Sequence, residues 1–382
     1  MSNKNNIIEN KNSSLELKEN DLPKQQLEEN NKKEKKSKKV SIIMFIINIL
    51  IVLGILLYNI TQNSEFTPLR ELSIDINYLI VILFITFLTI FIDSLITNLF
   101  LKTADHKGNL PLAYKSFSIM RYYDSITPMG AGGQPLMATY LMRNDISGSK
   151  AVSVPVKKFL TQQFSWLIIT SVGLVYTIVN KTITSPLILF FAIFGFTINL
   201  FLDSFILIGS ASEKISKGVS IWFLNLLKKL HIIKNYDKAL EKTTKFMEEY
   251  QLIMKEFSDN KKEFFGVLLM GVVKNFLYFC IPFFIYCCFE TIDFNLFLQF
   301  FTFTVMVELS ASCFPLPGGS GMNEITFSVL FTTYLPRAVF WAMLLWRFAS
   351  YYILIIQGIG IMAYDLIPKK DLNNQNKLEK NK

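Results

Sequence analysis

The most regular feature of the chain is a series of long apolar runs separated by polar segments. Runs of about 20 residues with few charges are long enough to cross a bilayer as helices. The pattern therefore predicts an all-α polytopic membrane protein and argues against a soluble one. We expect six full spans, at residues 40–60, 77–101, 159–179, 186–209, 264–289 and 340–361.

Two segments rich in proline and glycine interrupt further apolar stretches. The segment 315–324 reads Pro-Leu-Pro-Gly-Gly-Ser-Gly-Met-Asn-Glu, and 128–135 has a similar arrangement of prolines and paired glycines. Proline removes a backbone donor and glycine permits positive φ, so a continuous helix cannot pass through either segment. Broken backbone at membrane depth is stable only beside protein or a water-filled cavity. We expect each segment to be the turn of a re-entrant hairpin at a substrate site.

The order of spans and hairpins repeats along the chain. Two spans, a hairpin and a span occupy 40–179, and the same order occupies 186–363. Three spans separate the hairpins, and this odd number turns the second half upside down relative to the first. The pattern predicts an inverted repeat, an architecture of alternating-access transporters. The inversion would be lost if either hairpin crossed the membrane.

The charge pattern predicts the topology. Lysine-rich segments are expected on the cytoplasmic side, which places both termini there in a multi-pass protein of the cell membrane. The net charge of +9 fits segments that lie beside anionic lipid, and no nucleic-acid partner is expected. We expect a disordered cytoplasmic tail at 1–39, a membrane domain at 40–365, a cytoplasmic loop at 210–263 and a second tail at 366–382.

The loop 210–263 contains apolar residues at helical spacing between 236 and 257, with Lys and Glu on the opposite face. This amphipathic helix could dock on the bundle, lie on the membrane or bind a partner, and we favour docking. The four cysteines fall in apolar segments without the spacing of a zinc site, so we interpret them as structural thiols. We expect no metal and no cofactor.

Two charged residues precede the first break. Arg121 and Asp124 are three residues apart and would share one face of a helix, where they could form a structural ion pair. Arg121 could instead hold a lipid phosphate, because its guanidinium offers two parallel donors. Further along, Arg347 lies in mid-span and is expected to face inward, with Glu308 and Lys274 as candidate partners.

Glu324 follows the second break and opens a short helix. It could bind a cationic headgroup or a proton, or it could cap the first turn of that helix. The preceding Gly-Gly-x-Gly turn exposes backbone N–H groups that could seat a phosphate. Asp93 and Asp203 occur in similar strings near the ends of their spans, and for both we favour hydrogen bonds between packed helices.

The motifs at the two breaks resemble those of a known family. Arg121-x-x-Asp124-x-x-x-Pro128 is followed by paired glycines, and Pro315-x-Pro-Gly-Gly-x-Gly-x-x-Glu324 is followed by Arg337 and Arg347. Both are similar to the lysylphosphatidylglycerol synthase membrane domain, also called the flippase-like domain, over roughly residues 40–365. The resemblance implies these substrate-binding residues: Arg121, Asp124, Pro128, Gly132, Gly133, Pro317, Gly318, Gly319, Gly321, Glu324 and Arg347.

Full-length members of that family also carry a cytoplasmic aminoacyltransferase domain that moves lysine from lysyl-tRNA to phosphatidylglycerol. The chain ends at residue 382, shortly after the last expected span, so we expect that domain to be absent. The expected function is translocation of a phospholipid or lipid-linked headgroup, such as lysylphosphatidylglycerol, between leaflets. The alternatives are phosphatidylglycerol lysyltransferase activity and a membrane scaffold for a separate transferase. Expected partners are membrane phospholipid, a separate transferase and further copies of the chain.

Overall fold

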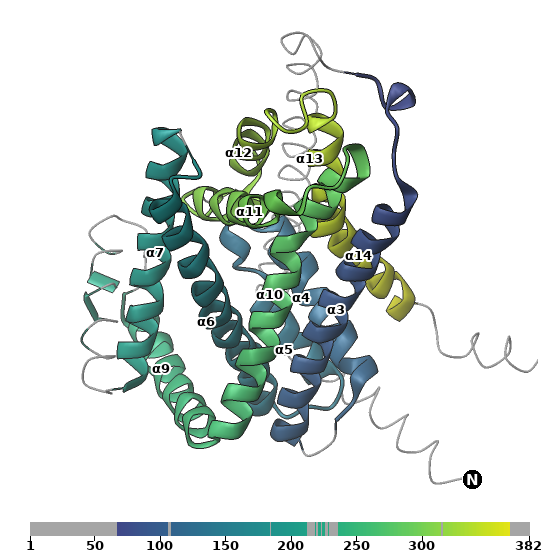
Figure 1. Cartoon of the computed structure of the whole chain (residues 1–382). Helices are drawn as coiled ribbons and strands as arrows, with labels where there is room; N and C mark the ends of the chain where they lie inside the picture. Colours follow the sequence, from purple (N-terminus) through teal and green to yellow (C-terminus); the bar gives the residue numbers. More distant parts are fainter. Residues whose placement is uncertain are drawn as a thin grey trace, which may run out of the picture. The chain divides into compact units, whose positions relative to one another are not determined.

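The computed structural model describes residues 67–105, 108–183, 185–211, 236–314 and 316–366, with six isolated positions at 218, 221, 222, 224, 225 and 228. Within these residues the structure contains eleven α-helices and no strand (Figure 1). The longer helices are α3 (Ile76–Asp105), α6 (Gly148–Asn180), α7 (Pro186–Ala211), α9 (Tyr236–Asp259) and α10 (Lys261–Phe289). The shorter ones are α4 (Leu110–Ile126), α5 (Gly133–Arg143), α11 (Phe297–Ala311), α12 (Met322–Phe331), α13 (Val339–Arg347) and α14 (Ile353–Leu366).

Six segments of the described chain are long and apolar enough to cross a membrane. Five of them confirm predicted spans: Ile76–Ala104, Gly148–Asn180, Pro186–Ser204, Lys261–Phe289 and Val339–Asp365. The predicted span 40–60 and the predicted tail 1–39 lie outside the described residues. The chain is therefore an all-α polytopic membrane protein, as the apolar runs predict.

The sixth segment, Phe294–Ala311, includes α11, which we expected to be only a hairpin arm. Its length and composition also suit a span. In Figure 1, however, α11 runs across the bundle, whereas its neighbour α10 runs along it.

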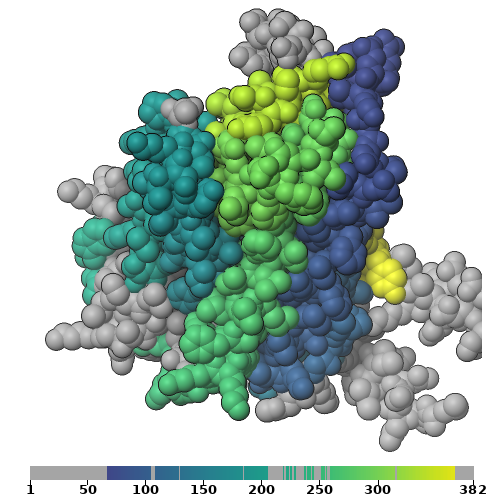
Figure 2. Space-filling view, viewed as in Figure 1, coloured from purple at the N-terminus to yellow at the C-terminus, as the bar shows by residue number. Residues whose placement is uncertain are grey.

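The outer surface of the long helices is apolar. Large exposed side chains include Phe84 on α3, Val175 on α6, Phe190 on α7 and Leu269 on α10. In Figure 2 the teal surface of α6 and α7, the green surface of α10 and the blue surface of α3 lie side by side on one face. A patch of this kind is unusual on a soluble monomer. It is the surface that contact with lipid tails requires.

The first break separates α4 from α5. Helix α4 begins at a capping residue, since the Asn109 side chain accepts a hydrogen bond from the Leu112 N–H at 3.1 Å. It ends at Ile126 and is followed by the short turn η2 (Pro128–Gly130), in which Gly130 has φ of +65°. The Thr127 hydroxyl accepts the Gly132 N–H at 3.0 Å, which fixes the chain between η2 and α5. The predicted interruption is confirmed.

The second break separates α11 from α12 and contains the turn η4 (Pro317–Gly319). Gly318, Gly319 and Gly321 have φ of +59°, +62° and +88°, values that side chains with a Cβ rarely adopt. The requirement for glycine predicted from this segment is therefore confirmed.

The two breaks meet inside the bundle. The turns η2 and η4 are in contact, α4 also contacts η4, and α14 packs along α4. The π-helix η5 (Phe348–Tyr352) joins α13 to α14, and its Tyr351 hydroxyl donates to the Ser125 carbonyl at 2.8 Å. In Figure 1, α4 and α5 lie toward the C-terminal end of α3, whereas α11 and α12 lie toward its N-terminal end.

The amphipathic helix α9 docks on the bundle, as we favoured. It contacts α6, α7 and α10, and its Ile253 is buried against Val156 and Leu160 of α6. Helix α9 thus packs against α6, α7 and α10 near the end of the bundle at which α10 begins.

Candidate functional site

A cavity of about 260 Å³ lies between α3, α4, α6, α10, α11 and η5. Its lining mixes aromatic and aliphatic side chains with polar and charged ones. The charged residues are Asp93, Arg121, Asp124, Lys158, Lys274 and Glu308. Because charges are expensive at membrane depth, a cavity with six of them is the strongest candidate for a functional site in the described part of the chain.

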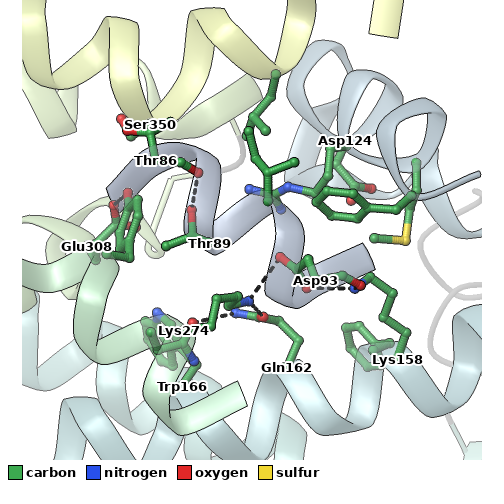
Figure 3. A pocket seen from close by; sticks show the side chains of 18 of the residues that line it. Thr86, Thr89, Asp93, Asp124, Lys158, Gln162, Trp166, Lys274, Glu308 and Ser350 are labelled. Carbon is green, nitrogen blue, oxygen red and sulfur yellow. Dashed lines mark hydrogen bonds and ion pairs between the residues drawn. The ribbon is translucent and has the colours of Figure 1, made fainter. Parts of the chain in front are cut away.

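Asp93 bridges two lysines on one wall of this cavity. Its Oδ1 lies 2.6 Å from the Lys158 Nζ, and its Oδ2 lies 3.3 Å from the Lys274 Nζ. Lys274 also donates a hydrogen bond to the Gln162 side-chain carbonyl. Figure 3 shows Asp93 between the two lysines, with dashed lines to both. All three charges are therefore paired in this wall.

Asp93 accepts the hydrogen bond between packed helices that we favoured, from Lys158 of α6, and this hydrogen bond is also an ion pair. The same interpretation is confirmed for Asp203, whose Oδ1 accepts a hydrogen bond from the Gln163 amide at 3.0 Å. The difference lies in the neighbouring helices, which present lysines to Asp93 and an amide to Asp203.

Arg121 lines the same cavity from α4 and is partly buried. Its guanidinium forms no hydrogen bond and no ion pair with any residue that the structure describes, Asp124 included. The structural ion pair considered for these two residues is therefore absent. The charge of Arg121 acts on every other charged residue of the lining. Arg121 is thus a cation of the cavity lining whose guanidinium has no partner in the described part of the chain.

Asp124 of α4 lines the cavity and also forms a hydrogen bond with the first residue of α5. Its Oδ1 accepts the Gly133 N–H at 3.0 Å. Gly133 is buried so tightly that a Cβ would collide with the Asp124 carboxylate and the Met120 carbonyl. Asp124 therefore lines the cavity and also holds the first hairpin together.

Glu308 faces the cavity from α11. The Tyr278 hydroxyl donates to its Oε1 at 2.5 Å, and no cation lies within ion-pairing distance of it among the described residues. In Figure 3, Glu308 and Asp124 lie on opposite sides of the pocket. Lys274 pairs with Asp93 rather than with Arg347, so both candidate partners proposed for Arg347 are wrong.

Arg347 pairs with Glu324 instead. The Arg347 Nε lies 2.5 Å from the Glu324 Oε1, and its Nη1 donates to the Gly318 carbonyl at 3.0 Å. The Glu324 Oε2 accepts the Gly321 N–H at 2.6 Å, which confirms the capping role considered for this carboxylate. The side chains are 4% and 0% exposed. Glu324 is therefore a buried structural charge, held by Arg347 and by the start of α12.

Three backbone amides of the second turn, where we considered a phosphate seat, donate to acceptors within the protein. The Gly319 N–H donates to the Leu316 carbonyl, the Ser320 N–H donates to the Pro317 carbonyl, and the Gly321 N–H donates to Glu324. Three of the amides that could bind an anion at this turn therefore have acceptors within the protein.

The structure brings only part of the predicted set to the cavity. Arg121 and Asp124 line it. The others form the two turns and their supports: Pro128, Gly132 and Gly133 at the first, and Pro317, Gly318, Gly319, Gly321, Glu324 and Arg347 at the second. Because η2 and η4 touch, these residues position the cavity without lining it.

Sequence reasoning missed most of the lining. Lys158 is not among the residues singled out from the sequence, and Lys274 pairs with Asp93 rather than with Arg347. One signal could have found them. Lys274 and Asp93 are single charges inside long apolar runs, and such charges are expected to pair with each other.

Comparisons with known proteins agree with this architecture. No curated protein and no solved structure matches the chain. A family model described as the lysylphosphatidylglycerol synthase TM region matches residues 45–358, which is most of the sequence. The chain therefore belongs to the family of the lysylphosphatidylglycerol synthase TM region.

Proposed function

We propose that this multi-pass membrane protein moves a phospholipid or lipid-linked headgroup, such as that of lysylphosphatidylglycerol, between leaflets through the cavity, and that Arg121 binds the headgroup phosphate. The observation that carries the proposal is the guanidinium of Arg121, which lines a charged cavity at the junction of the two hairpins and has no partner among the described residues. A guanidinium binds a phosphate through two parallel charged hydrogen bonds. A phosphate would supply the acceptors that this guanidinium lacks among the described residues.

The packing of the helices supports the inverted repeat as the frame of this transport. Consecutive elements pack in the same order in both halves, α3, α4, α5 and α6 in the first and α10, α11, α12 and α13 in the second. The turns η2 and η4 are equivalent elements in this scheme, and they touch. The opposite placement of the hairpins in Figure 1 supports hairpins that open on opposite faces of the membrane. Two such halves rocking about the cavity would expose Arg121 to one leaflet at a time.

The orientation is part of the same proposal. Lysine-rich segments place both termini in the cytoplasm and the chain in the cell membrane. On the same ground we propose the domain limits: a membrane domain at 40–365, a cytoplasmic segment at 210–263 and tails at 1–39 and 366–382.

The proposal is tested by following fluorescent phosphatidylglycerol between leaflets of vesicles that contain the purified protein. Arg121→Lys keeps the charge but loses the two parallel donors, so transport should fall about tenfold or more at matched protein content. The control is Arg143→Lys, since Arg143 is an exposed residue at the end of α5. Transport by Arg121→Lys equal to that of wild type would overturn the role of Arg121. Vesicles with wild-type protein that move no phospholipid would overturn the function itself.

A further inference from the structure

Glu308 is the carboxylate of the cavity with the weakest partner. The groups that face it are the Tyr278 hydroxyl from α10, Arg121 from α4 and Arg347 from α13, and neither arginine pairs with it. The other charges of the cavity are Asp93, Asp124, Lys158 and Lys274. A carboxylate at this depth needs a cation or a proton to balance its charge.

The other carboxylates accept hydrogen bonds from charged side chains or from backbone amides. Asp93 has two lysines, Asp124 accepts the Gly133 amide, and Glu324 has both Arg347 and the Gly321 amide. Among the described residues, Glu308 has only the Tyr278 hydroxyl. A tyrosine hydroxyl can donate to a carboxylate and can also accept from a carboxylic acid, so this hydrogen bond survives protonation. Glu308 can therefore gain a proton without losing its partner.

The charge balance of the cavity shows what a proton would do. Three cations, Arg121, Lys158 and Lys274, face three carboxylates, Asp93, Asp124 and Glu308. With all of them ionised the lining is neutral. The phosphodiester of an anionic headgroup would add one negative charge in a medium of low dielectric constant, where an uncompensated charge is strongly unfavourable. One proton on a lining carboxylate restores neutrality.

We propose that Glu308 is a proton-binding site coupled to the headgroup, so that an anionic phospholipid enters the cavity together with one proton. A proton from the water binds a Glu308 carboxylate oxygen when the phosphodiester binds Arg121, and it leaves when the headgroup leaves. A zwitterionic headgroup carries its own ammonium and enters without this proton. The inference rests on the proposed function and adds the class of substrate that is coupled to protons.

The test is calorimetric titration of the detergent-solubilised protein with short-chain phosphatidylglycerol and, separately, short-chain phosphatidylethanolamine. The number of protons bound is obtained from titrations in buffers of different ionisation enthalpy, from about pH 6 to about pH 9. With phosphatidylglycerol we expect binding to take up about one proton per headgroup. The affinity for phosphatidylglycerol should then fall by up to about tenfold for each unit by which the pH rises in the same range. With phosphatidylethanolamine we expect no uptake.

Two variants assign the proton to a residue. In Glu308→Gln, proton uptake with phosphatidylglycerol should vanish and the affinity should become independent of pH. Glu290→Gln is the matched control, because Glu290 is an exposed residue at the end of α10, and it should behave as wild type. Asp124→Asn should retain the uptake, since Asp124 is the second carboxylate of the lining without an ion pair.

Each contrary outcome is informative. Phosphatidylglycerol binding without proton uptake, or equal uptake with both lipids, would overturn the coupling while leaving the proposed function intact. Loss of uptake in Asp124→Asn rather than in Glu308→Gln would overturn the assignment to Glu308. The comparison of the two lipids uses wild-type protein alone, so it remains decisive if a variant fails to fold. Failure of both lipids to bind would count against the proposed function as well.

Discussion

Removal of the Arg347 charge should destabilise the protein through the carboxylate that it leaves behind. Glu324 is fully buried and keeps only the Gly321 N–H once Arg347 is replaced. Breaking a buried ion pair by removing one partner typically costs about 3–5 kcal/mol. Arg347→Met keeps the approximate length of the side chain and removes its charge, so we expect a loss of this size in the free energy of unfolding.

Glu324→Gln and the double variant separate the charge from the shape. Glu324→Gln keeps an acceptor for the Gly321 N–H but leaves the Arg347 charge buried and uncompensated, so it should also be strongly destabilising. The double variant with Arg347→Met has no buried charge at this site, and it should be more stable than the sum of the single effects predicts. The assay is equilibrium unfolding in mixed micelles of mild detergent and dodecyl sulfate. Arg143→Met, an exposed change, is the control and should be close to wild type.

Two results would refute this reasoning. Additive single effects would show that Arg347 and Glu324 do not stabilise each other. Wild-type stability of Glu324→Gln combined with an altered pH dependence of transport would show that Glu324 acts on the substrate or on a proton, and that the capping geometry is secondary.

Two further predictions concern the hairpins. Gly133→Ala should destabilise the first hairpin by about 1–3 kcal/mol, because the added Cβ has no space beside Asp124. The control is Gly360→Ala, which should be neutral or slightly stabilising because a Cβ there would meet nothing within 4 Å. Equal effects of the two substitutions in the unfolding assay would contradict the packing argument. Single cysteines at both ends of each hairpin should react with a membrane-impermeant thiol reagent from one side only. Positions 108 and 148 should react from the cytoplasm, and positions 293 and 336 should react from outside. Labelling of either pair from two sides would rule out the inverted repeat.

The helices and breaks could be predicted from the sequence because they depend on local chemistry. An apolar run of about 20 residues has few structural solutions in a bilayer. Consecutive glycines next to proline end a helix wherever they occur. The capping role of Glu324 was also accessible, because its hydrogen bond to Gly321 spans only three residues.

The charge pairs could not be predicted, because they depend on which faces of distant helices meet. Asp93 and Lys158 are 65 residues apart on different helices, and Arg347 is 23 residues from Glu324. From composition alone, Glu308 was as good a partner for Arg347 as Glu324. Only the packing of α12 and α13 decides between them, and that packing leaves Glu308 to the cavity.

The central claim is that Arg121 binds the phosphate of a phospholipid, and a distance between the two tests it most directly. Protein labelled with ¹⁵N-arginine is mixed with one equivalent of short-chain phosphatidylglycerol in a maltoside detergent that contains no phosphorus. The ³¹P–¹⁵N dipolar coupling is then measured in the frozen complex. We predict a guanidinium nitrogen at about 4 Å from the phosphorus, the separation that a charged hydrogen bond gives, and its loss in Arg121→Lys. A bound lipid that shows no such coupling, or the same coupling in Arg121→Lys, would contradict the account.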